Sequence, residues 1–108
     1  MDAANAPPGM EELQEQARAA ARLLRLLGNE NRLIVLCHLA GAGEVSVGAL
    51  AEAVGLSQPA LSQHLALLRE DGLVATRKEA QAVHYRLADP KAAALLGLLR
   101  DLFCGSSC

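Results

Sequence analysis

A run of short polar side chains between positions 57 and 64 could bind the edges of DNA bases. The run is SQPALSQH, and at helical spacing Leu61 continues an inward apolar stripe with Leu65 and Leu68, so the polar side chains lie elsewhere. A solvated helix face usually carries Lys and Glu, whereas Ser, Gln and His offer donors and acceptors suited to a major groove. The candidate DNA contacts are Ser57, Gln58, Ser62, Gln63 and His64. For His64 two roles stay open, a contact to the DNA backbone and a brace for its own helix.

The cysteines are the second group of residues that could do chemistry. They are three, widely spaced and without a CxxC motif, which does not describe the disulfide framework of a secreted domain. A free cysteine is most often a small buried hydrophobe. A redox role is the alternative for Cys37 and Cys104, because Cys104 ends a predicted helix beside Gly105 and the helix of Cys37 must pack near it if both build one side. Cys108 could be a spectator or could compete for Cys104 in disulfide exchange.

Composition limits the kinds of protein that this chain can be. It has 108 residues, enough for one domain, and is 52% hydrophobic but only 2% aromatic. Leu, Ala and Val must therefore fill the core, which favours helices packed on helices and disfavours nucleic-acid binding by aromatic stacking. The net charge of −2 excludes a uniformly basic coat. Residues 57–86 nevertheless carry four basic and three acidic side chains, and Arg77 and Lys78 are candidate phosphate contacts.

Apolar periodicity and helix-capping residues predict four helices, a β-hairpin and a last helix. Glycines 28, 41, 43, 55 and 72 mark helix ends, and Ser46, Ser57 and Asp89 are suitable N-caps. After Gly72 the period changes from that of a helix to that of a strand. The expected elements are helices at 11–27, 29–40, 46–54 and 57–71, strands at 73–78 and 83–87, and a helix at 90–103.

The first and last of these helices carry more apolar surface than one small domain can bury. On the first helix, Leu13, Ala17, Ala20, Leu24 and Leu27 recur at helical spacing as one apolar stripe, and Leu23 and Leu26 form a second apolar set. The last helix is apolar nearly all round, with Leu95, Leu96, Leu98, Leu99, Leu102 and Phe103, while the second helix has little polar face and should be largely buried. A homodimer interface on the first and last helices follows. The alternative is a membrane-binding or aggregation-prone surface.

A polar helix after a short helix, followed directly by a hairpin, predicts a winged helix-turn-helix (α-α-α-α-β-β-α), mostly α with a β-hairpin wing. The alternative is a generic helical domain that carries a hairpin. We expect a flexible tail over 1–9, one DNA-binding and dimerisation domain over 10–104 and a flexible tail over 105–108. The sequence shows neither a signal peptide nor an apolar run of membrane length, so we expect a cytoplasmic protein that does not enter a membrane.

The run SVGALAEAVGLSQPALSQHLALLREDGLVATRKEAQAVHYRLAD resembles the ArsR/SmtB family of bacterial winged-helix repressors. The segments NRLIVLCHL and LLRDLFCG are similar to the BigR/SqrR/HlyU group of that family, the thiol-based regulators of sulfide and oxidant responses. The resemblance covers about Leu23 to Cys104. It implies a homodimeric repressor of double-stranded operator DNA, with Cys37 and Cys104 in the positions of the sensing pair. Persulfide, polysulfide or another oxidant would link the pair and lower the affinity for DNA; Cys108 has no counterpart.

Two other classes of function remain as alternatives. A metal-responsive repressor of this family would need cysteines near the start of the third helix or Asp and His ligands on the last helix, and neither set is complete. Zinc could bind only if Cys37, His38 and Cys104 converged, so we expect neither metal nor cofactor. A winged helix used for protein contacts is the other alternative. We do not expect an enzyme, because no phosphate-binding loop and no nucleophile–base–acid set is present.

Overall fold

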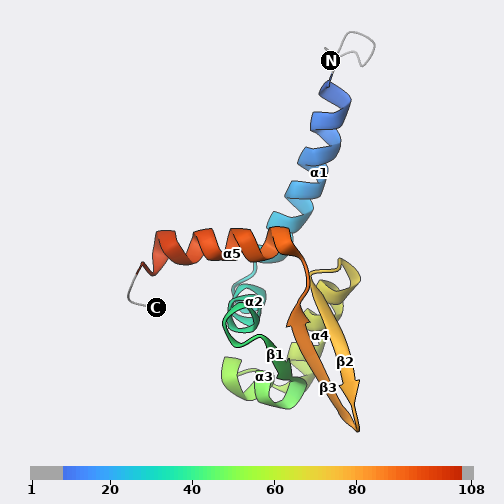
Figure 1. The fold of residues 1–108 in the computed structure, drawn as a ribbon, viewed down its shortest axis with the longest axis vertical. Coiled ribbons are helices and arrows are strands. Elements are labelled where there is room, and N and C mark those ends of the chain that lie inside the picture. The colour runs from blue at the N-terminus through green and yellow to red at the C-terminus, as the bar shows by residue number, and fades with distance from the viewer. Residues whose placement is uncertain (1–8, 106–108) are drawn as a thin grey trace.

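The computed structural model describes residues 9–105 and places the elements in the expected order, with one additional strand (Figure 1). Residues 1–8 and 106–108, which make up most of the two expected tails, lie outside the described residues. The elements are α1 (Met10–Leu27), α2 (Glu30–Ala42), β1 (Glu44–Ser46), α3 (Val47–Val54), α4 (Gln58–Glu70), β2 (Val74–Glu79), β3 (Ala82–Leu87) and α5 (Pro90–Phe103).

Side-chain caps start the helices where the sequence predicts them. The Ser46 hydroxyl accepts a hydrogen bond from the Ala49 N–H and the Ser57 hydroxyl accepts one from the Ala60 N–H, each at 3.3 Å. Asp89 does the same for α5, accepting from the Lys91 N–H at 2.9 Å. Each cap satisfies an N–H that has no partner inside the first turn of its helix. The predicted starts of α3, α4 and α5 are therefore confirmed.

The helix ends agree with the predictions except at Gly41. Gly72 has a φ of 77°, and the Leu73 N–H donates to the Leu68 carbonyl at 2.9 Å, which closes the expected turn after α4. The prediction that Gly41 breaks α2 is wrong, because the helix continues through Gly41 to Ala42, two residues beyond its expected end; the predicted break at Gly43, with a φ of 85°, is confirmed. A glycine permits a left-handed backbone but does not impose one.

The sheet contains a strand that sequence patterning missed. β1 is three residues long and pairs antiparallel with β3, with Val45 opposite Tyr85, so the sheet order is β1-β3-β2. Three residues are too few to display a period of two, which is why no pattern revealed it. The β2–β3 connection is also shorter than expected, because pairing continues to Glu79 and Ala82 and leaves only Ala80 and Gln81 in the turn.

The core lies between α2, α3, α4 and the inner face of the sheet. Its largest fully buried side chains are aliphatic, and each contributes about 1.5–3 kcal/mol by leaving water. They are Val35, Leu36, Leu39, Leu50, Leu61, Leu65 and Leu68. The predicted inward stripe of α4 is confirmed, and with it the position of the opposite, polar face.

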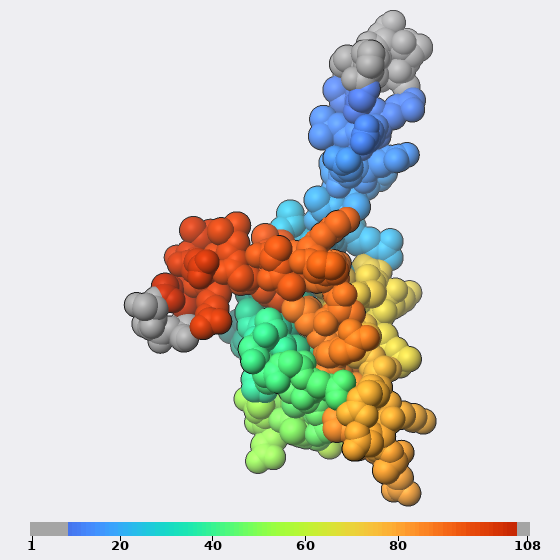
Figure 2. Space-filling view, viewed as in Figure 1, coloured from blue at the N-terminus to red at the C-terminus, as the bar shows by residue number. Residues whose placement is uncertain are grey.

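Helices α1 and α5 project from this body in different directions (Figures 1 and 2). The radius of gyration is 16.7 Å, whereas a compact chain of this length would have about 13 Å. On α1 only Leu26 and Leu27 are buried, while Leu13 and Leu24 are more than half exposed. Most of the main stripe of α1 is thus exposed, and Leu26 of the second set lies in the core, because only the last turn of α1 reaches the body.

The exposed apolar surface continues on α5 and α2. On α5, Leu96 is buried but Leu102 and Phe103 are 68% and 83% exposed, as expected for a helix that one domain cannot cover. The expectation that α2 is largely buried is only half right, because Ile34 is exposed and Cys37 lies on the same outer side. Within residues 9–105, no helix combines the length and the apolar character that crossing a bilayer requires.

The different backbones of Gly72 and Gly41 predict that alanine substitutions at the two positions change the free energy of unfolding in opposite directions. Gly72→Ala forces a Cβ into a left-handed backbone, so it should lower the free energy of unfolding by about 1–2 kcal/mol. Gly41→Ala places a Cβ in open space on a helical backbone and should raise it by about 0.5 kcal/mol. Urea denaturation followed by circular dichroism measures both. Equal effects of the two substitutions would contradict the assigned backbone.

Candidate nucleic-acid interface and thiol site

The polar residues predicted to contact DNA lie together on α4. Because Leu61, Leu65 and Leu68 are buried, the opposite side of the helix faces solvent. The structure leaves Ser57, Gln58, Ser62 and Gln63 exposed and His64 half-buried. Ser57 also caps the helix, and the Gln58 amide lies beside α3, where its nitrogen would be 3.7 Å from a Cβ at Gly48. Among the exposed predicted DNA contacts, Ser62 and Gln63 therefore remain as the two that neither cap α4 nor lie beside α3.

The β2–β3 hairpin carries two predicted phosphate contacts that differ in their surroundings. The Arg77 guanidinium donates to Glu44 Oε1 from Nε at 2.9 Å and from Nη2 at 2.6 Å, and it also donates to Glu79 Oε2 at 2.5 Å. These contacts raise the pKa of Arg77 and lower the pKa values of Glu44 and Glu79. Two carboxylates therefore balance its charge. Lys78 is exposed and has no ion pair among residues 9–105.

A bidentate ion pair that the sequence did not predict joins α1 to the end of α4. Arg22 donates from Nε to Asp71 Oδ2 at 2.7 Å and from Nη2 to Oδ1 at 2.6 Å. Asp71 is the residue that ends α4, and its side chain is only 13% exposed. The hydrogen bonds from Arg22 are the main cause of the lowered pKa of the Asp71 carboxyl. The partners are 49 positions apart, so no local pattern could have revealed the pair.

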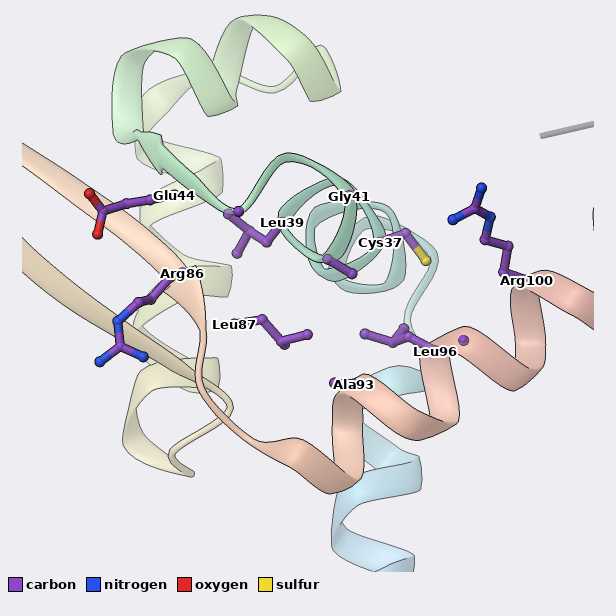
Figure 3. Close-up of a pocket in the computed structure, with 12 residues that line it drawn as sticks. Cys37, Leu39, Gly41, Glu44, Arg86, Leu87, Ala93, Leu96 and Arg100 are labelled. Carbon is purple, nitrogen blue, oxygen red and sulfur yellow. The ribbon is translucent and has the colours of Figure 1, made fainter.

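The two predicted redox cysteines lie on elements that pack against each other. Cys37 lies on α2 and lines a cavity together with Leu96 and Arg100 of α5 (Figure 3). Cys104 ends α5, and its N–H donates to the Arg100 carbonyl at 2.8 Å. Leu96, Arg100 and Cys104 are spaced four apart and so follow one side of α5, the side that contacts α2.

The thiol chemistry of the two positions differs in this structure. Cys37 is a free thiol on the outer side of α2, and partial burial by its neighbours raises its pKa. Cys104 is disulfide-bonded, and Cys37 is not its partner. The predicted bridge between Cys37 and Cys104 is therefore not formed here. Among the described residues, no group of three or more His, Cys, Asp or Glu side chains could hold a metal ion.

The chain is similar to a known family in its central segment and to individual relatives over most of its length. Residues 29–76 match the family described as "Bacterial regulatory protein, arsR family". The chain is 48% identical over 99 residues to the transcriptional activator HlyU of Vibrio cholerae. The aligned region covers 92% of this chain and 91% of that protein. It is 43% identical over 94 residues to the biofilm growth-associated repressor of Xylella fastidiosa, with 87% and 82% covered.

The fold of this chain superimposes on solved structures over most of its length. Reduced HlyU from Vibrio cholerae superimposes with a TM-score of 0.82 at 49% identity, over 87% of this chain and 98% of that one. The repressor BigR from Xylella fastidiosa gives 0.80 at 42% identity, over 88% and 96%. A homodimeric winged helix-turn-helix DNA-binding domain from Mycobacterium bovis gives 0.72 at 33% identity, over 92% and 88%. The fold is thus a winged helix-turn-helix, as predicted.

The Arg22–Asp71 pair predicts a pH dependence of stability. Arg22 lowers the pKa of Asp71 in the folded state below its unfolded value of about 3.9. The stabilisation is therefore complete above that value and is lost as the pH falls through the lowered folded-state pKa. We expect Asp71→Asn to be less stable than the wild type at pH 7 and equally stable at the acid limit, in urea denaturation at a series of pH values. Asp101→Asn, on α5, is the matched control, and a difference independent of pH would contradict the prediction.

Proposed function

The chain belongs to the arsR family of bacterial regulatory proteins and is a DNA-binding transcriptional regulator, and on that basis we propose a homodimeric repressor controlled by the thiols of Cys37 and Cys104. The observation that carries the proposal is the position of these residues on the facing sides of α2 and α5. Helix α2 also contacts α3 and β3, so a bond formed at Cys37 is well placed to disturb the helix-turn-helix and the wing.

The exposed faces of α1 and α5 support assembly with a second copy. Leu98 and Leu102 lie on the side of α5 opposite the buried Leu96, and Leu13 and Leu24 form a similar exposed stripe on α1. Soluble monomers rarely leave contiguous apolar surface of this kind uncovered. The Mycobacterium bovis domain described above is homodimeric, which agrees with this assignment.

Two copies would read an operator with two half-sites. In this arrangement the α4 helices enter successive major grooves roughly one helical turn apart, and Gln63 contacts a base edge. Lys78 contacts a phosphate, while Arg77 contributes less because Glu44 and Glu79 balance its charge. One copy offers few unpaired cations, so affinity depends on both copies binding at once.

The proposed switch is a sulfur-transfer reaction followed by bridge formation. The Cys37 thiolate attacks the outer sulfur of a persulfide R–S–SH, so that Cys37–S–SH forms and R–S⁻ leaves and takes up a proton. The reaction sequence starts from the reduced protein, in which Cys104 is a thiol: its thiolate then attacks the Cys37 sulfur, the S–SH bond of Cys37 breaks, and hydrosulfide leaves. The bridge pulls α2 and α5 together, changes the spacing of the α4 helices and weakens DNA binding. To empty an occupied operator, the two states must differ in DNA affinity by about 5 kcal/mol.

The DNA contacts are tested by two substitutions with different signatures. Gln63→Ala should cost about 1–3 kcal/mol at one base pair and relax the preference there, because only a base contact carries sequence information. Lys78→Ala should weaken binding to all sequences equally and reduce the slope of log affinity against log salt by about 1. Fluorescence anisotropy at several salt concentrations separates the two. Glu79→Gln, which removes one carboxylate from Arg77, should strengthen binding to all sequences, and unchanged affinity in all three variants would contradict the interface.

The dimer is tested by a charge on the exposed side of α5. Leu102 is 68% exposed in one copy, so Leu102→Glu should leave the monomer folded while burying an unpaired carboxylate in the dimer. We expect the dissociation constant of the dimer to rise by about 100-fold or more, measured by analytical ultracentrifugation. Ala53→Glu on α3 is the matched control. A wild-type protein that is monomeric at micromolar concentration would refute the two-half-site arrangement.

The thiol pair is tested by single cysteine variants. Cys37→Ser and Cys104→Ser should each fold and bind DNA, because serine is nearly isosteric and neither thiol lies on the DNA-contacting face. Each should stay on DNA after persulfide treatment, whereas the wild type and Cys108→Ser should be released. Gel shifts, with mass spectrometry of the same samples, provide the measurement, and zinc is the control for metal-controlled release. Release of Cys37→Ser by persulfide would defeat the pair and implicate Cys104 with Cys108.

A further inference from the structure

A cavity of about 640 Å³ opens beside the free thiol, between α2, the end of β3 and α5 (Figure 3). Cys37 and Arg100 lie at one end, and Glu44 and Arg86 lie at the other. The aliphatic side chains of Leu39, Leu87 and Leu96 lie between the two ends. The cavity is large enough to hold a small organic molecule such as a short peptide, and it is much larger than a diatomic or triatomic oxidant needs.

The charges that line the cavity favour an anion. The Arg86 and Arg100 side chains are exposed and make no hydrogen bond or ion pair with the residues that the structure describes, but Arg86 points away from the cavity in Figure 3. Glu44 is the one carboxylate of the lining, and its Oε1 accepts two hydrogen bonds from Arg77, which lies outside the cavity. The negative charge is thus compensated from outside, whereas the Arg100 guanidinium, at the Cys37 end, is available to a ligand.

Small residues keep the cavity open. Gly97 lies in the middle of α5, where glycine costs a helix about 1 kcal/mol relative to alanine. Its backbone does not need glycine, since it is not among the positive-φ residues, and a Cβ there would meet nothing within 4 Å. Packing within one copy therefore gives no reason for glycine at this position. A larger side chain would instead occupy the space beside Ala93 and Leu96 that leads to Cys37.

We propose that this cavity docks a small organic persulfide that carries carboxylates, with Arg100 binding a carboxylate and Cys37 receiving the outer sulfur. A guanidinium binds a carboxylate through two parallel hydrogen bonds, so it would fix both the position and the orientation of the donor. The transfer is the first step given above: the S–S bond of the donor breaks, its electron pair leaves with R–S⁻, and Cys37–S–SH forms. The inference rests on the proposed function and assigns Arg100 as the residue that positions the donor for it.

Docking compensates for a thiol that is a poor nucleophile by itself. The partly buried Cys37 has a raised pKa, so little of it is thiolate at neutral pH. A bound donor raises the local concentration of the electrophile and can offset that deficit. Arg100 is a positioning residue in this scheme, since it contacts the donor and not the sulfur that is transferred.

The test compares donors with and without carboxylates. The rate of Cys37 persulfidation, measured by quenched mass spectrometry of the reduced full-length protein, is determined with glutathione persulfide and with the uncharged 2-hydroxyethyl persulfide. Arg100→Gln should react about tenfold more slowly with the first donor and nearly unchanged with the second. Arg100→Lys should recover part of the rate. Lys91→Gln removes a cation from α5 outside the cavity lining and should match the wild type.

A second variant tests the cavity independently of its charge. Gly97→Leu should slow both organic donors but leave the reaction with hydrogen peroxide unchanged, because only the larger molecules need the space. Equal slowing of Arg100→Gln with both donors would show that Arg100 acts on the thiol itself and would overturn the proposal. In that case Arg100→Gln would also change the pKa of Cys37, and the pH profile of Cys37 alkylation by iodoacetamide, an uncharged reagent, would shift relative to the wild type. Rates identical to the wild type would overturn it directly.

The cavity and the switch can fail separately. If wild-type Cys37 is persulfidated with the expected donor preference and DNA is not released, the proposed function fails while the donor site stands. If persulfide releases DNA and Arg100→Gln shows no donor preference, the switch stands and the donor site fails.

Discussion

The burial of one side of α2 is the constraint on which the rest of the structure depends. Val35, Leu36 and Leu39 are fully buried, and α2 packs against α1, α3, α5, β1 and β3. Close-packed side chains of this kind do not deform continuously, so a displacement of α2 must be shared with its neighbours or be resisted by them. The other side of the same helix carries Cys37. One element thus holds the Cys37 thiol on its outer side and part of the core on its inner side.

Ion pairs then determine which charges remain available at the surface. Exposed pairs contribute little to stability, generally less than about 1 kcal/mol, so their effect here lies in geometry and in charge balance. The Arg22–Asp71 pair joins α1 to the C-cap residue of α4. On the wing, Glu44 and Glu79 balance Arg77. The same Glu44–Arg77 contact compensates the carboxylate of the cavity beside Cys37, so one ion pair makes the wing less cationic and the cavity less anionic.

Helix α5 uses different sides for the proposed dimer interface and for the cavity beside Cys37. The side of α5 with Leu96 and Arg100 faces α2 and the cavity, while the side with Leu98 and Leu102 is exposed. These faces are separate, so the leucines of the proposed dimer interface and the cavity lining occupy different sides of α5. Large aromatic side chains are correspondingly few, with one Tyr, one Phe and no Trp in the chain.

The sequence by itself determined the local structure of this protein. Ser46, Ser57 and Asp89 predict helix starts, Gly72 predicts the end of α4, and the leucine stripe of α4 predicts which side of it is polar. These features succeed because capping and periodicity act between residues at most five positions apart. Only the tertiary structure decided the rest: the strand β1, the exposed stripe of α1, the Arg22–Asp71 and Arg77–Glu44 pairs, and the cavity that joins Cys37 to Arg100. Each of these joins segments 33 or more positions apart or depends on how far a helix reaches into the body, and such proximity leaves no local pattern in the chain.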